Sequence, residues 1–259
     1  MIYGLYLSAT GVLTNAYRQD VIANNLANAE TVGFKRSLAT FQERLTEAQR
    51  TRQPDKTNAM LENIGGGTFP SPTYIDHSQG SLEETHGSLD VALHGRGFFA
   101  VRTGNTDADL RLTRNGQFMV DKAGYLVLAN GSGHRVLDEK RKPIQFAGPN
   151  VSNLEFKPDG TITAGEEPVA RLGIFDVPDE KQLMPRGGTL LSYPGDLRRL
   201  PPVVNPTVAQ GFVERSNVDP MIELTQLINA QRQLEANANM IRYQDQTLGK
   251  LVSEVGKVG

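Results

Sequence analysis

The two ends of the chain carry hydrophobic residues at helical spacing, whereas the middle alternates in the manner of strands. In both ends the spacing alternates between four and three residues. The N-terminal seam comprises Ile2, Leu5, Ala9, Val12, Ala16, Gln19, Ala23 and Leu26. The C-terminal seam comprises Leu224, Leu227, Gln231, Leu234, Ala238, Ile241, Asp245, Leu248 and Val252. This period of about 3.5 residues predicts helices that pack along their length, against the other terminus or against a neighbouring chain.

The signals at the helix starts are of unequal strength. In the C-terminal helix, Asp219 can cap the first turn, Pro220 takes the first helical position, and Glu223 follows where the helix dipole favours a carboxylate. In the N-terminal helix, Gly4 and Gly11 each cost about 1 kcal/mol relative to alanine. The N-terminal segment is therefore expected to depend on packing to remain helical.

Both helices carry amides where a solvated surface would carry charge. Residues 1–30 contain Arg18, Asp20 and Glu30 as their only charged side chains, and both helices are rich in asparagine and glutamine. Neutral amides cost less to desolvate than charges, and they donate and accept hydrogen bonds at once. We interpret both helices as enclosed on more than one side. The alternative is a coiled-coil stalk with solvated outer faces.

Between the helices the chain changes character twice. The first helix is expected to end near Asn28, and Phe41 and Leu45 favour a short helix over residues 36–48. The chain up to residue 72 is polar and then glycine-rich, which predicts a connector. From residue 73 to about residue 209 the strand signals are dense. Asn115-Gly116 between two alternating runs is a strong hairpin signal, and residues 121–124, 130–131 and 158–160 predict further turns.

Together these segments predict an α+β fold. Its terminal helices form a discontinuous coiled-coil domain that encloses a central all-β domain. The predicted parts are an N-terminal helix (1–35), a connector (36–72), a central β-domain (73–209) and a C-terminal helix (210–259).

The composition excludes several classes of function. The 259 residues carry a formal net charge of −2, so the chain has no basic field for nucleic acid and no cationic face for a membrane surface. Cysteine is absent, which excludes disulfides, thiolate metal sites and cysteine nucleophiles. No segment reads as a membrane span or a cleavable signal peptide. We therefore expect neither a nucleic-acid partner nor membrane insertion.

No arrangement of residues predicts catalysis, a cofactor or a metal. Residues 95–100 (GRGFFA) have the letters of a dinucleotide fingerprint, but a strand is predicted after them where phosphate binding needs a helix. Gly95 and Gly97 are therefore interpreted as a turn or bulge with at least one positive φ. The four histidines stand apart, and no serine lies in a nucleophile elbow. An enzyme is the weakest functional hypothesis.

Four segments, taken together, carry a resemblance to a known family. They are Ala23-Asn24-Asn25-Leu26-Ala27-Asn28 with Thr31 and Gly33-Phe34-Lys35; Asp90-Val91-Ala92-Leu93 with Gly95 and Gly97-Phe98-Phe99; Leu112-Thr113-Arg114 with Gly116, Phe118, Asp121 and Gly124; and Gly211-Phe212-Val213-Glu214 with Ser216-Asn217-Val218. In this order they resemble motifs of the bacterial flagellar rod and hook proteins. The resemblance spans nearly the whole chain.

The resemblance implies a structural subunit of the periplasm-spanning rod of the flagellar basal body. It implies export by the flagellar type III apparatus without a cleavable signal peptide, and helical stacking with the terminal helices inside. Such stacking is a non-closing interface of the kind that builds filaments. The implied partners are the same chain, other rod subunits, and hook or ring components, with no cofactor. The implied function is to carry torque from motor to hook.

The resemblance leaves alternatives within the family. A single β-domain favours a rod subunit over a hook protein, and residues 236–241 favour the proximal rod over the distal rod. A hook-type subunit, or another secreted filament or adhesin subunit, is the alternative.

The expected assembly interface draws on the two seams and the first motif. Its residues are Leu5, Ala9, Val12, Ala16, Ala23, Asn24, Asn25, Leu26, Asn28, Gly33, Phe34, Leu224, Leu227, Gln231, Leu234, Ala238, Ile241 and Leu248.

The isolated protein is expected to be a monomer with disordered ends and a folded β-domain. A seam with two glycines and little charge cannot bury itself alone, so it gains order only with neighbours. Limited proteolysis should trim the chain to a core of roughly residues 73–209. Resistance of the full-length chain at low concentration would contradict this expectation.

Overall fold

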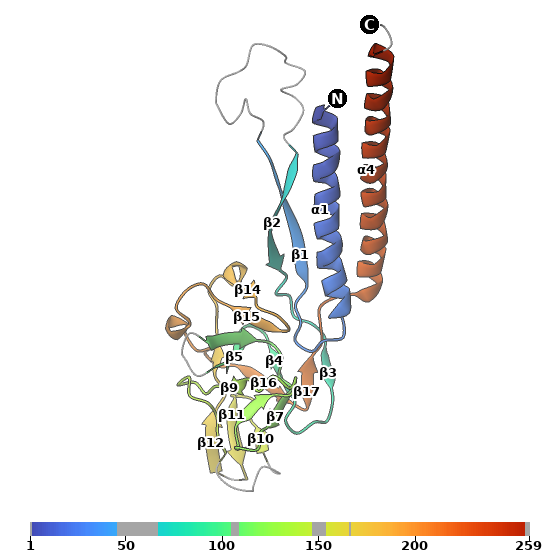
Figure 1. The fold of residues 1–259 in the computed structure, drawn as a ribbon. Helices are drawn as coiled ribbons and strands as arrows, with labels where there is room; N and C mark the ends of the chain where they lie inside the picture. Colours follow the sequence, from blue (N-terminus) through green and yellow to red (C-terminus); the bar gives the residue numbers. More distant parts are fainter. Residues whose placement is uncertain (1, 46–66, 105–108, 147–153, 166, 257–259) are drawn as a thin grey trace. The chain divides into compact units, whose positions relative to one another are not determined.

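The computed structural model describes residues 2–45, 67–104, 109–146, 154–165 and 167–256, and the chain forms two compact units. The helical unit comprises Met1–Ala27, Ser37–Tyr74 and Asp219–Gly259. The β-unit comprises Asn28–Arg36 and Ile75–Val218. The fold is α+β with a helix at each end and a β-rich middle, as predicted (Figure 1). The predicted domain boundaries at residues 35, 72 and 209 remain predictions.

The helical unit is built on two long helices, α1 (Ile2–Ala27) and α4 (Pro220–Val255). The predicted cap of α4 is confirmed, because the Asp219 carboxylate accepts from the N–H groups of Met221 and Ile222 at 2.9 and 3.2 Å. The two helices lie side by side and antiparallel (Figure 1). Their coiled-coil geometry stays a prediction.

The antiparallel alignment follows from three contacts between α1 and α4. A Cβ atom placed on Gly4 would lie 2.9 Å from the Gln244 side-chain nitrogen, and one placed on Gly11 would lie 2.8 Å from that of Asn237. Near the other end of α1, Asn25 donates to the Glu223 carboxylate at 3.3 Å. The glycines thus leave room for amides of α4, which explains how two weak helix formers are accommodated.

The prediction of a short helix over residues 36–48 is wrong for residues 37–43, which form strand β1 (Ser37–Glu43). This strand pairs with β2 (Thr68–Ile75), and the Arg44 N–H donates to the Gly67 carbonyl at 2.8 Å. Phe41 lies edge-on to Tyr17 of α1 at 6.3 Å. Pairing with a distant strand and packing on α1 override the local helical spacing. The predicted connector therefore holds two strands, and its residues 46–66 lie outside the described residues.

The described strands of the β-unit form four antiparallel groups. The largest follows the order β14-β15-β6-β5-β9-β8-β7, with β13 paired to β5; the others are β10-β11-β12, β16-β4 and β17-β3. The strands are β3 (Leu82–Glu84), β4 (Val91–His94), β5 (Phe98–Arg102), β6 (Leu110–Thr113), β7 (Phe118–Val120), β8 (Leu126–Leu128), β9 (Arg135–Val136), β10 (Leu154–Phe156), β11 (Thr161–Ala164), β12 (Glu167–Arg171), β13 (Ile174–Phe175), β14 (Met184–Pro185), β15 (Leu190–Ser192), β16 (Thr207–Gln210) and β17 (Phe212–Glu214). Two short 3₁₀ helices, η3 (Glu180–Gln182) and η4 (Leu197–Arg199), lie among the later strands.

Strand β5 divides the core of the β-unit in two. Phe99 and Val101 belong to one buried cluster, whereas Phe98 and Ala100 belong to the other. Successive residues of a strand point to opposite faces, so a strand that is buried on both faces has a continuous apolar run. The run from Phe98 to Val101 is therefore explained by burial on both sides of β5.

The predicted Asn115-Gly116 hairpin is wrong. Strand β6 pairs with β5 and β15, and β7 pairs with β8, so the two strands beside Asn115 do not pair with each other. The Asn115 side chain instead accepts from the Gln117 N–H at 2.9 Å, and Gly116 accepts from the Val91 N–H at 3.0 Å. A Cβ atom on Gly116 would lie 1.6 Å from the Val91 carbonyl oxygen. Close backbone approach, not a hairpin turn, is what requires glycine here.

Gly97→Ala should destabilise the β-unit more than Gly95→Ala. Both glycines have positive φ, +88° at Gly95 and +115° at Gly97, which confirms the predicted positive φ. A left-handed backbone conformation costs an L-residue about 1–2 kcal/mol. A Cβ atom on Gly97 would also lie 2.8 Å from Val203 and 2.9 Å from Ile174, whereas one on Gly95 meets no atom within 4 Å. Thermal unfolding of the two variants is the measurement, and equal losses would contradict the steric argument.

Candidate functional site

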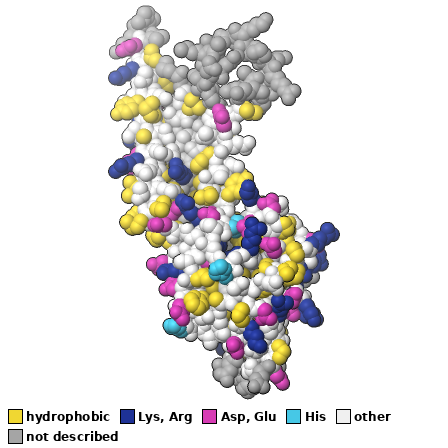
Figure 2. All heavy atoms as spheres, turned by 180° about the vertical axis from the view of Figure 1, so that it is seen from behind, with side chains coloured by type: hydrophobic (Ala, Val, Ile, Leu, Met, Phe, Trp, Pro, Cys, Tyr) yellow, Lys and Arg dark blue, Asp and Glu magenta, His cyan; other side chains and the backbone are white. Residues whose placement is uncertain are grey.

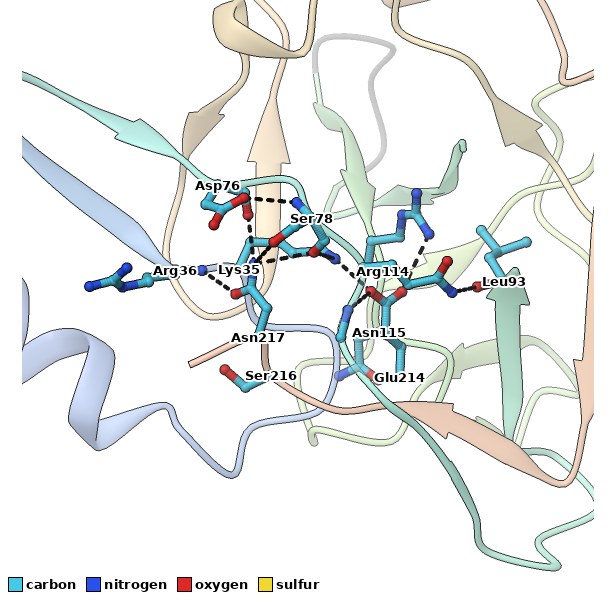
Figure 3. A network of polar contacts seen from close by, with 12 residues as sticks. Lys35, Arg36, Asp76, Ser78, Leu93, Arg114, Asn115, Glu214, Ser216 and Asn217 are labelled. Carbon is cyan, nitrogen blue, oxygen red and sulfur yellow. Dashed lines mark hydrogen bonds and ion pairs between the residues drawn. The ribbon is translucent and has the colours of Figure 1, made fainter. Parts of the chain in front are cut away.

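A buried carboxylate, Glu214 at the end of β17, binds two cations in the β-unit. The Lys35 Nζ lies 2.5 Å from its Oε1, and the Arg114 Nη1 lies 3.3 Å from its Oε2. The three side chains are 3%, 4% and 0% exposed for Lys35, Arg114 and Glu214 respectively. Figure 3 shows the three groups converging from separate segments. This ionic network joins residues that lie 179 and 100 positions apart in the sequence.

Close backbone contacts bring these segments together. The Gly33 N–H donates to the Glu214 backbone carbonyl at 2.7 Å, and Gly33 has a φ of +70°. A Cβ atom on Gly33 would lie 2.3 Å from the Asn115 backbone nitrogen. Arg114 donates to the Gly95 carbonyl at 2.7 Å and its guanidinium lies 5.0 Å from the centre of the Phe98 ring. All four segments that carry the family resemblance therefore contribute to one network.

Hydrogen bonds occupy both oxygens of the Glu214 carboxylate. Its Oε1 accepts from Lys35 and from the Gly80 N–H at 3.0 Å, and its Oε2 accepts from Arg114. Burial lowers the pKa of Lys35, and Glu214 opposes this change. Burial also lowers the pKa of Arg114, again against the effect of Glu214. The arrangement suits a structural clamp, because the carboxylate is committed to internal partners.

The side chain of Asn217 makes a second set of contacts beside this network (Figure 3). Its oxygen accepts from the Arg36 N–H at 2.7 Å, and its nitrogen donates to the Asp76 carbonyl at 2.9 Å and to the Ser78 hydroxyl at 3.0 Å. The pKa of Asp76 is lowered, chiefly because its carboxylate accepts from the Ser78 N–H. The neighbouring His77 has its pKa lowered to about 4 by burial and by the charge of Lys35.

Sequence reasoning missed Lys35, Arg114, Glu214 and Asn217 as functional residues. Their signal was present, since each is a polar or charged residue inside a motif of mostly small and apolar residues. No single motif indicates which charges pair, however. The pairing depends on the fold of the whole β-unit.

The predicted interface residues have three kinds of environment in the single chain. Asn25, Gly33 and Phe34 are buried, and Ala23, Asn24, Leu224 and Gln231 are exposed. The others are half-buried: Leu5, Ala9, Val12, Ala16, Leu26, Asn28, Leu227, Leu234, Ala238, Ile241 and Leu248. Their role at an interface between subunits stays a prediction.

The face of α4 that meets α1 contains residues from outside the predicted seam. It includes Glu223, Asn237 and Gln244, which contact Asn25, Gly11 and Gly4. Ala230, 1% exposed, continues the same seven-residue spacing. Glu223, Asn237 and Gln244 each lie one position before a residue of the predicted seam, namely Leu224, Ala238 and Asp245.

Asn25 of α1 is a buried polar residue that bonds to both β1 and α4. It is 1% exposed, its Nδ2 donates to the Ser37 carbonyl at 2.8 Å, and its Oδ1 accepts from the Ser37 N–H at 2.9 Å. The same Nδ2 lies 3.3 Å from the carboxylate of Glu223, which is itself 1% exposed. Asn25 therefore connects α1, α4 and the start of β1 within the helical unit.

Neither a metal-ligand cluster nor a membrane-spanning helix occurs among the described residues. Within the described ranges, no three histidine, aspartate or glutamate side chains gather closely enough to hold a metal ion. None of the described helices combines the length and apolarity that a membrane span needs. The fold and the buried ionic network define a protein with a β-unit and two paired terminal helices.

Three family models match the chain. They are described as flagella basal body rod protein (residues 5–35), flagellar hook protein FlgE/F/G D1 domain (92–164) and flagellar basal body rod FlgEFG protein C-terminal (209–254). The chain is 34% identical to the flagellar basal-body rod protein FlgG of Buchnera aphidicola subsp. Schizaphis graminum, over 97% of this chain and 99% of that protein.

Two further relatives agree with this result. The flagellar basal-body rod protein FlgF of Caulobacter vibrioides is 32% identical over 98% of both chains, and FlgG of Bacillus subtilis is 28% identical over 98% of this chain and 99% of its own. The chain therefore belongs to the flagellar basal-body rod protein family. This family is structural and not enzymatic, and it places the chain in the flagellar basal body.

Glu214→Gln is expected to destabilise the β-unit by about 3–5 kcal/mol, because it leaves two buried cations without a counter-charge. Glu83→Gln is the matched control. Glu83 pairs with Arg215 at the surface, where the side chains are 51% and 45% exposed, so its loss should cost about 0–1 kcal/mol. Urea unfolding followed by circular dichroism compares the two variants. Similar losses in both would show that the Glu214 network does not stabilise the fold.

Proposed function

We propose that this rod subunit polymerises helically through its terminal helices and so transmits torque from motor to hook. The observation that carries the proposal is the apolar surface that α4 leaves exposed in the single chain. The exposed large apolar residues of α4 are Met221, Ile222, Leu224, Ile228, Met240, Tyr243, Leu251 and Val252. In Figure 2, hydrophobic side chains, drawn in yellow, gather on the surface of the helical unit. Apolar surface of this kind favours an interface with neighbouring chains.

The polar residues between these apolar side chains suit burial in an assembly. Gln231, Gln233, Asn239 and Gln246 of α4 are all exposed in the single chain. An amide loses less free energy than a charge when it leaves water, and it can bond to a neighbour's backbone or side chains. A helix with apolar and amide surface together can therefore be enclosed on several sides by copies of itself.

The distribution of the hydrophobic core supports a division of labour between the two units. Both large buried clusters of the described residues lie in the β-unit. Such a unit can hold its fold alone, whereas a pair of helices and a two-stranded sheet has little core of its own. We infer that the β-unit is the stable body of the subunit and that the helical unit gains most of its stability from neighbours, in coiled-coil packing.

The partners and the route to the rod are part of the same proposal. The proposed partners are further copies of this chain, other rod subunits, and hook or ring components. We also infer export by the flagellar type III apparatus without a cleavable signal peptide. The relatives carry two names, FlgG and FlgF, and support either a proximal or a distal position. Our preference for the proximal rod rests on residues 236–241.

Leu224→Asp is expected to prevent rod assembly without unfolding the subunit. Leu224 is 43% exposed in the single chain, so a charge is tolerated there until a neighbour covers it. Burying an unpaired carboxylate then costs several kcal/mol, and motility should be lost. Leu224→Met is the control, because a swap of similar volume usually costs less than about 1.5 kcal/mol. Motile cells with normal rods in the Leu224→Asp strain would refute the proposal.

A further inference from the structure

Three contacts between α1 and α4 share one alignment of the two helices. Gly4 lies beside Gln244, Gly11 beside Asn237, and Asn25 beside Glu223. From the first pair to the second, the position advances by seven residues along α1 and retreats by seven along α4. From the second pair to the third, both changes are fourteen residues. The contacts therefore define a single antiparallel register that repeats with the heptad.

The apolar pattern alone does not select this register. Because both helices repeat every seven residues, a slide of one heptad, about 10.5 Å at 1.5 Å per residue, again places seam on seam. A slide in one direction brings Gly11 opposite Gln244, and a slide in the other brings Gly4 opposite Asn237. Both displaced pairs again put an amide against a glycine, so they avoid steric overlap.

What the displaced registers lose is the contact between Asn25 and Glu223. In the first, Asn25 lies opposite Ala230, and Glu223 lies beyond Ala27, the last residue of α1. In the second, Glu223 lies opposite Arg18, but Asn25 lies beyond Pro220, the first residue of α4. Asn25 is also held on both sides by the backbone of Ser37, so it cannot follow a slide of α4.

We propose that the buried pair Asn25 and Glu223 determines the register of the terminal helices. The proposal rests on the function proposed above, since the paired helices are the surface through which subunits assemble. A buried polar pair is well suited to this role, because a wrong register leaves a desolvated amide and carboxylate without each other. The glycines of α1 leave room for the amides of α4 in more than one register. The contact between Asn25 and Glu223 then selects the observed register.

Disulfide formation can report the register, because the chain contains no cysteine of its own. The pair Gly11→Cys with Asn237→Cys reports the observed register. The pairs Gly11→Cys with Gln244→Cys and Gly4→Cys with Asn237→Cys report the two displaced registers. Each pair is expressed as the full chain, together with unmodified chain so that rods form. Disulfides are then measured by mass spectrometry of purified basal bodies.

The test compares Asn25→Leu with Asn15→Leu in each cysteine background. Asn15 is the matched control, since its amide bonds to the Gly11 carbonyl of its own helix at 2.9 Å. With Asn25 intact, or with Asn15→Leu, the observed-register disulfide should dominate. With Asn25→Leu, its excess over the displaced disulfides should fall by about tenfold or more, the usual effect of losing a hydrogen bond to a charged group.

Exclusive formation of the observed-register disulfide in Asn25→Leu chains would overturn the proposal. If Asn25→Leu chains do not enter rods, Asn25→Ser decides, because serine is too short to connect Ser37 and Glu223 but adds no apolar bulk. Displaced disulfides in Asn25→Ser chains would support the proposal, and the observed-register disulfide alone would overturn it. If no pair forms a disulfide in rods with Asn25 intact, the proposed pairing of the terminal helices fails, and not the role of Asn25 alone.

Discussion

The β-unit depends on keeping the Glu214 carboxylate dry and fully bonded. A carboxylate removed from water is stable only where cations and N–H donors replace its hydration. Lys35, Arg114 and the Gly80 N–H supply them, and each comes from a different segment of the chain. Those segments must approach one another more closely than side chains would allow. A Cβ atom on Gly80 would lie 1.9 Å from the Arg215 carbonyl oxygen, so glycine there is a condition for the ionic network.

This dependence explains why the four sequence motifs occur together. Seen separately, they suggest a helix end, a strand with a turn, a hairpin and a helix start. In the structure, Lys35, Gly95, Arg114 and Glu214 from these motifs meet in one network. Removing Glu214 leaves Lys35 and Arg114 buried without this counter-charge, and removing either cation leaves Glu214 with only the other. The four motifs are therefore separate in the sequence but belong to one ionic network in the structure.

Local signals in the sequence predicted the elements that local energetics control. The cap at Asp219, the turn at Asp121–Gly124 and the positive φ of Gly95 and Gly97 all depend on neighbours within a few residues. Strand β1 and the turn at Asn115-Gly116 were predicted wrongly, because partners elsewhere in the chain decide them: β2 for the first and Val91 for the second. Lys35 and Glu214 lie 179 residues apart, so no periodic pattern in the sequence predicts that they pair.

The helix pair shows a related limit of the apolar pattern. The heptad seam predicted that α1 and α4 pack along their length, but it did not predict that Glu223, Asn237 and Gln244 would face α1. Apolar residues such as Met221 and Val252 stay exposed on α4 in the single chain. Burial of apolar area is non-directional, so it cannot by itself tell the intended partner from a neighbour's helix. Buried polar contacts can distinguish the two, because only one alignment of the helices satisfies their hydrogen bonds. Both units therefore follow one rule, in which apolar burial supplies the stability and a few desolvated polar pairs select the arrangement.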